Sequence, residues 1–135
     1  MAAIRAQIAP VELHLRPVRI REEGDPSWVV AQLELVNANA VLMSQVLTLT
    51  RDDIRDFGTR IAEVGSGRSS TCWLSNMDEN FVLAAREMQG TGVAWLGFWS
   101  GEPHELMKGY GFLVTGAALV QFAQSLLSEE AALTP

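Results

Sequence analysis

The chain has 135 residues, the length of a typical single domain, so we expect residues 1–135 to fold as one unit without disulfides or metals. Apolar residues are 48% of the chain and charged residues 19%, which excludes a disordered chain, and its apolar runs are too short to cross a bilayer. The net charge of −6 predicts that neither nucleic acid nor an anionic membrane is a partner.

The first third of the chain shows the apolar and polar alternation that is typical of strands. Residues 1–10 lack a period and are expected to be a loose start, and Pro17 marks an edge position or a bulge in the strand that begins at Val11. Further strands are predicted over 28–36 and about 40–49, joined through a reversal at 37–39. Three strands joined by short turns predict an antiparallel meander.

A helix is predicted to begin after Thr50, whose side chain can cap the backbone N–H of Asp53. Apolar residues then recur at helical spacing and predict one buried stripe, which ends at the glycines around position 66; the stripe is Ile54, Phe57, Gly58, Ile61 and Ala62.

The second half repeats this order with four strands and a second helix. The strands are predicted over 70–74, 81–88, 93–99 and 106–114, the helix follows Thr115, and the tail from Ser128 is expected to be loose. We therefore predict an α+β fold: an antiparallel sheet of about seven strands, in the order βββα-ββββα, with two amphipathic helices packed on one face. The two Thr-capped helices have similar sequences and begin 65 residues apart. Either the unit of strands and a helix is duplicated, or the similarity is the one that any capped amphipathic helix shows.

No motif of a catalytic or cofactor site is present, so we expect no enzyme activity and no cofactor. The best local cluster is Glu102, His104 and Glu105, which offers two carboxylates and an imidazole to a metal, although charged residues also collect in turns without a function. The single cysteine, Cys72, excludes an intrachain disulfide and favours a cytoplasmic location.

The candidate binding residues are tryptophans and acids. Trp95 and Trp99 lie on one face of the strand 93–99, and the opposite face of this strand is also apolar. If the rest of the chain does not cover the two tryptophans, they form an interface. Gly109 and Gly111 leave a gap in the next strand that a tryptophan can fill. The acids Asp52, Asp53 and Asp56 offer an acidic face to a basic partner, or simply suit the helix dipole.

The order of elements resembles that of the WapI-type immunity proteins and related uncharacterised small bacterial proteins. The stretches that carry the resemblance are Leu47–Phe57, Phe81–Ala85 and Gly111–Thr115 leading into the last helix, and the acidic residue expected in the middle strands appears as Glu87. The resemblance implies a cytosolic protein that binds and neutralises a toxin domain without catalysis.

Three functions remain open at this point. The first is a protein-binding module, in its sharpest form an immunity protein for a basic toxin domain, which an acidic chain suits. The second is a small-ligand-binding domain or an enzyme without a recognisable motif, with a pocket between sheet and helices for which Gln45 and Lys108 are the polar candidates. The third is a structural homo-oligomer built through a sheet face.

Overall fold

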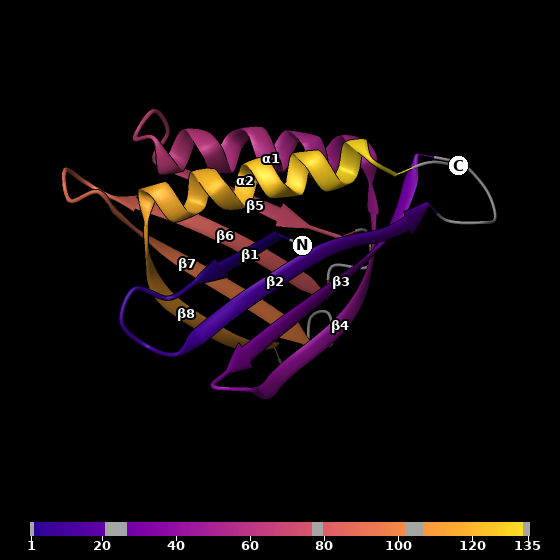
Figure 1. Cartoon of the computed structure of the whole chain (residues 1–135), viewed down its shortest axis with the longest axis horizontal. Helices are drawn as coiled ribbons and strands as arrows, with labels where there is room; N and C mark the ends of the chain where they lie inside the picture. Colours follow the sequence, from indigo (N-terminus) through magenta and orange to yellow (C-terminus); the bar gives the residue numbers. More distant parts are fainter. Residues whose placement is uncertain (1, 21–26, 77–79, 102–106, 134–135) are drawn as a thin grey trace.

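The computed structural model describes residues 2–20, 27–76, 80–101 and 107–133 (Figure 1). The elements in chain order are β1 (Ala2–Arg5), β2 (Val11–Ile20), β3 (Trp28–Asn37), β4 (Ala40–Thr50), α1 (Arg51–Gly65), β5 (Thr71–Ser75), β6 (Phe81–Met88), β7 (Val93–Gly101), β8 (Met107–Thr115) and α2 (Gly116–Ala131).

The strands form two antiparallel sheets of four strands each, in the orders β1-β2-β3-β4 and β5-β6-β7-β8. The α+β class is confirmed, but the prediction of a single sheet of about seven strands is wrong. The apolar alternation reveals which side of each strand is buried and does not reveal which strand is its neighbour. The two sheets can bury their inner faces against each other, whereas one long sheet would need the two helices alone to cover a whole face.

Both chain ends are more ordered than the sequence predicts. Residues 2–5, expected to be loose, form β1 because Ala2 and Ile4 are buried when the strand pairs with β2. Helix α2 continues past Ser128 to Ala131, and its Glu130 is 3% exposed and paired with Arg51. Short apolar segments such as Ala2–Arg5 have too few residues to show a period, which is why β1 escaped detection.

The predicted helix caps and turns are present. The Thr50 side chain accepts a hydrogen bond from the Asp53 N–H at 3.0 Å, and Thr115 accepts one from Ala118 N–H at 3.1 Å. The β3–β4 hairpin closes through Ala38 and Asn39, both at positive φ. The register of β2 on β3 shifts between Pro17 and Arg19, so the proline lies at a bulge.

Each helix packs against the sheet that it does not follow. Helix α1 follows β4 and lies on β5 and β6, whereas α2 follows β8 and lies on β1 and β2; the two helices lie side by side (Figure 1). The chain therefore contains two units, each made of four strands and one helix, and the helix of each unit packs on the sheet of the other unit.

A single apolar core joins the inner faces of both sheets and the buried stripes of both helices. Its largest side chains come from α1, α2 and the second sheet: Phe57, Phe81, Phe98 and Phe122. In the described part of the chain, neither helix is long and apolar enough to cross a membrane.

Candidate functional site

The outer face of the β5–β8 sheet carries three of the four tryptophans of the chain. Strand pairing places Trp73, Ala84, Gly97 and Gly111 in one cross-strand row, and Trp95 and Trp99 flank this row on β7. We call this surface the Trp face; its defining residues are Trp73, Ala84, Arg86, Trp95, Gly97, Trp99, Gly109 and Gly111.

Trp95 and Trp99 lie against a floor of glycines. Their ring centroids are 5.7 Å apart with the planes at 51°. A Cβ atom on Gly97 would be 2.3 Å from the Trp95 ring and 2.6 Å from the Trp99 ring, and one on Gly111 would be 2.4 Å from Trp95. The absence of side chains at these glycines lets the indoles lean onto the sheet, as the sequence predicted for the gap in β8.

No described segment of the chain covers the Trp face. Trp73 is 61% exposed, Met88 and Leu113 are also exposed, and Trp95 and Trp99 are half-buried. The helices contact this sheet but bury their apolar stripes in the common core, which contains the inner-face residues. A contiguous exposed apolar surface of this kind marks a binding site in soluble proteins.

The charge of the Trp face differs from that of the chain as a whole. Among the described residues whose side chains point outward from β5–β8, Arg86 is the one charged residue, and there is no carboxylate. Arg86 forms no ion pair or hydrogen bond with the described residues, in contrast to Arg51, Arg55 and Arg60 on α1. An unpaired guanidinium beside exposed indoles suits a ligand that combines aromatic rings with negative charge.

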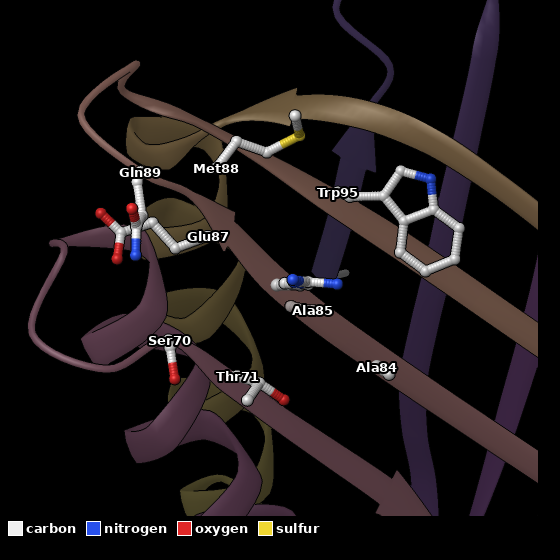
Figure 2. A pocket seen from close by; sticks show the side chains of 9 residues that line it. Ser70, Thr71, Ala84, Ala85, Glu87, Met88, Gln89 and Trp95 are labelled. Atoms are coloured by element: carbon white, nitrogen blue, oxygen red, sulfur yellow. The ribbon is translucent and has the colours of Figure 1, made fainter.

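A hollow of about 820 Å³ opens at one end of the Trp face (Figure 2). Its lining includes Thr71, Ala84, Arg86, Met88 and Trp95. Ser70, Glu87 and Gln89 line the same hollow, and in Figure 2 Glu87 and Gln89 lie away from Trp95, toward the loop that leads into β5. This size lies within the range of small-ligand sites.

The acidic candidates lie on α1 and not on the Trp face. Asp52 pairs with Arg55 at 3.1 Å and Asp56 pairs with Arg60 at 3.1 Å, all on the exposed side of the helix. Asp53 occupies the first turn, where the helix dipole favours a negative charge. The structure thus brings Trp95 and Trp99 together and leaves the three acids apart from them.

The remaining candidates do not form a second site. Glu102, His104 and Glu105 lie outside the described residues, and within the described ranges no three histidine, cysteine or acidic residues are grouped to hold a metal. Gln45 accepts a hydrogen bond from Ser100, which links β4 to β7, and Lys108 is exposed at the start of β8. Burial raises the pKa of the Cys72 thiol to about 11, so it stays protonated at neutral pH.

Sequence reasoning missed Trp73 and Arg86. A signal for both was available, because the alternation of β5 and β6 places Trp73 opposite Ala84, on the same side as Arg86. The missing step was the register of β5 on β6 and of β6 on β7, which joins these residues to Trp95.

Comparison with known proteins identifies the fold. No protein-family model matches the chain, and no curated protein sequence matches it. Solved structures do match, among them that of the plant transcriptional regulator PBF-2, at 15% identity and a TM-score of 0.55, and that of WHY3 from Arabidopsis thaliana, at 13% identity and a TM-score of 0.56. Each of these two matches covers 97% of this chain, and 80% and 86% of the respective neighbour. The chain has the fold of these plant proteins.

This finding corrects the sequence-based view of the function. The immunity-protein interpretation and the protein-binding role built on it are wrong, because the fold is shared with a transcriptional regulator. The exclusion of nucleic acid as a partner is wrong for the same reason. It rested on the net charge of −6, and a total charge does not describe the charge of one face.

Proposed function

We propose that the chain binds single-stranded nucleic acid by stacking bases on the Trp face. The observation that carries the proposal is the set of three indoles on a sheet face without a described carboxylate. The fold shared with a plant transcriptional regulator supports it. Stacking needs no reacting group, so we propose a binding protein and not an enzyme.

A single strand fits this surface better than a duplex. In a duplex the faces of the bases are covered by their neighbours, whereas an unpaired base can lay its ring on an aromatic side chain. Trp95 and Trp99 rest on glycines, and Trp73 is largely exposed two strands away. Adjacent strands are about 4.8 Å apart, so Trp73 lies roughly 10 Å across the sheet from the β7 pair, a span that suits successive bases.

The electrostatic contribution to this binding is small. Arg86 is the one described cation that points outward from the sheet, and each phosphate neutralised on a single strand contributes a slope of about −0.7 to the salt dependence of the affinity. We therefore expect a slope near −1, much shallower than that of a basic nucleic-acid-binding protein. The acidic remainder of the chain repels the phosphates elsewhere and confines the strand to this face.

The test is a titration with a labelled oligothymidylate of about 20 nucleotides, longer than the roughly 4–16 nucleotides that one OB domain covers. Oligouridylate of the same length distinguishes RNA from DNA, and a duplex is the competitor. Fluorescence anisotropy of the label gives the affinity, and quenching of the intrinsic tryptophan fluorescence reports the contact, since three of the four indoles lie on this face.

The variants Trp73→Ala and Trp95→Ala should each weaken binding about 5- to 100-fold, because one stacked base contributes about 1–3 kcal/mol. Val46→Ala is the matched control, since Val46 is an exposed apolar residue on the other sheet. Failure of both homopolymers to bind, or equal losses in Val46→Ala and Trp73→Ala, would overturn the proposal.

A further inference from the structure

Strand β4 forms one edge of the first sheet, and its outer side is open. A terminal strand of an antiparallel sheet has a neighbour on one side only, so every second residue directs its backbone N–H and C=O groups away from the sheet. Among the described residues, no group outside β3 makes a hydrogen bond to the backbone of residues 40–49. The side chain of Val46 is 68% exposed, which agrees with an edge that the chain leaves uncovered.

The other three edge strands each contact a further segment of the chain. Helix α2 lies against β1, where the Glu129 carboxylate accepts a hydrogen bond from the Ala2 N–H at 3.1 Å, and helix α1 lies against β5. The connection between β1 and β2 reaches the edge of β8, where the Gln7 N–H donates to Leu113 O at 2.7 Å. Within the described ranges, β4 is therefore the edge that is free to pair with a further strand.

The sequence of β4 lacks the residues that normally keep an edge strand from pairing. Natural edge strands carry charged residues, above all lysine, or a proline, or they are very short. Strand β4 has 11 residues, none of which is charged and none of which is proline. A bulge at Leu42 interrupts its start, but from Met43 to Thr50 it pairs with β3 in a regular register. This regular part can serve as the template for another strand.

The strand that matches this edge is β4 of a second copy of the chain. Antiparallel pairing about a two-fold axis at Val46 places this valine opposite its own copy and Ser44 opposite Thr48 of the second copy. Apolar pairs and pairs of hydroxyl side chains are favourable cross-strand neighbours. Two chains that each carry a net charge of −6 repel each other, and a strand without charges is where they can meet at least cost.

We propose that two copies of the chain form a dimer by antiparallel pairing of β4 with β4, centred on Val46. The first sheets of the two copies then form one continuous sheet of eight strands. The same edge is used in both copies, so the contact closes on itself and gives a dimer and not a fibre. The inference is independent of the proposed function, because the pairing uses no residue of the Trp face.

The first experiment measures the molar mass of the full chain by sedimentation equilibrium, without nucleic acid. Between about 1 and 100 μM, where contacts of small area associate, the mass should rise from 14.8 kDa towards twice this value. A mass that stays at 14.8 kDa over the whole range would overturn the inference. This result would leave the stacking of bases on the Trp face untouched.

The second experiment places a positive charge on the axis. In Val46→Lys two ammonium groups would lie opposite each other, so the dimer should weaken roughly tenfold or more. Ile8→Lys is the matched control, since Ile8 is an exposed apolar residue in the connection between β1 and β2. The control should dimerise like the unaltered chain. Equal dimerisation of the two variants would overturn the inference, because the second copy would then bind at another surface.

The third experiment tests the register with a cysteine. Residues directly opposite each other in an antiparallel pair have Cα atoms about 4.5–5.5 Å apart, which a disulfide can span. Val46→Cys should therefore form a covalent dimer under mild oxidation, seen on a non-reducing gel, since the native Cys72 is buried.

Ser44→Cys is the control for the register. Ser44 is exposed on the same side of β4, but in the proposed pairing its copy lies four positions away along the strand, roughly 14 Å. It should form a disulfide far more slowly than Val46→Cys. Equal rates in the two variants would show that the chains meet by random collision, and the proposed pairing would be wrong.

Discussion

The two sheets have the same strand order and opposite outer surfaces. On the β1–β4 sheet, the outward side chains form a polar network: Arg16 donates to Gln32, Gln32 donates to Glu34, and His14 Nε2 lies 3.0 Å from Glu12. On the β5–β8 sheet the corresponding surface is the Trp face. The inner faces are alike, since both consist of small and aliphatic residues with phenylalanines in the second sheet.

The contrast separates what the fold requires from what a function requires. The inner faces share one core, so their composition is constrained by packing in both units. The outer faces carry no such constraint, and one of them has retained exposed indoles that a purely structural sheet would replace with polar residues. The comparison therefore directs the search for function to the β5–β8 sheet, and the following predictions test its parts.

The largest expected effect concerns the contact that joins the two units. Arg51, the first residue of α1, donates through Nε to the Glu130 carboxylate on α2 at 2.6 Å and through its terminal nitrogen to Glu130 O at 2.9 Å. Glu130 is 3% exposed, so Arg51→Ala leaves a buried carboxylate with a single partner, Arg55, at 3.6 Å. We expect the free energy of unfolding to fall by about 3 kcal/mol, measured by urea denaturation.

Arg60→Ala is the control for this variant, because its side chain is more than half exposed and its pair with Asp56 on the same helix lies at the surface. We expect a loss below about 1 kcal/mol there. Equal losses in the two variants would show that the buried pair does not link the units as the structure indicates.

The sequence predicted the local structure well and the assembly of the sheets poorly. The caps at Thr50 and Thr115 and the reversal at 37–39 depend on neighbours in the chain, and each is present. The division into two sheets depends on contacts between distant segments, such as α1 on β5 and α2 on β1. Alternation contains no information on these contacts, so a single sheet was as compatible with the pattern as two.

The candidate site was predicted in part. Trp95 and Trp99 were found because they share a phase with each other on a strand that is apolar on both sides, and the glycine gap was found in the adjacent strand. Trp73 and Arg86 come from strands whose register was not predicted, so they were not assigned to the same surface. The charge argument failed because it summed over the whole chain, whereas a ligand meets one face.

A smaller effect is expected from closing the glycine floor. An added Cβ in Gly97→Ala would be 2.3 Å from the Trp95 ring and 2.6 Å from the Trp99 ring, so both indoles must tilt. The rings are free to move outward, and we expect the stability to change by no more than about 1 kcal/mol. The near-ultraviolet circular dichroism of the Trp95–Trp99 pair should change clearly, and the affinity for oligothymidylate should fall a few-fold as the stacking surface is disturbed.

Gln32→Ala is the matched control for Gly97→Ala. Gln32 lies 65 residues earlier, the same spacing that separates the two Thr caps, and it points outward from the other sheet. It should leave the aromatic circular dichroism unchanged. An unchanged spectrum in Gly97→Ala would mean that the indoles do not rest on the glycine floor in solution.

The smallest expected effect is an absence of reaction at Cys72, which lies on the inner face of the same sheet that exposes the tryptophans. The thiol is 1% exposed, and burial raises its pKa from 9.0 to about 11. Because the folded protein favours the protonated thiol, this contribution to stability is fully present below about pH 9 and is lost as the pH rises toward 11. At about pH 8 we expect iodoacetamide to modify Cys72 only as the chain unfolds, and to do so readily in urea, as followed by mass spectrometry. Rapid modification of the native protein would place Cys72 at an accessible surface and would contradict the assignment of inner and outer faces on which the Trp face depends.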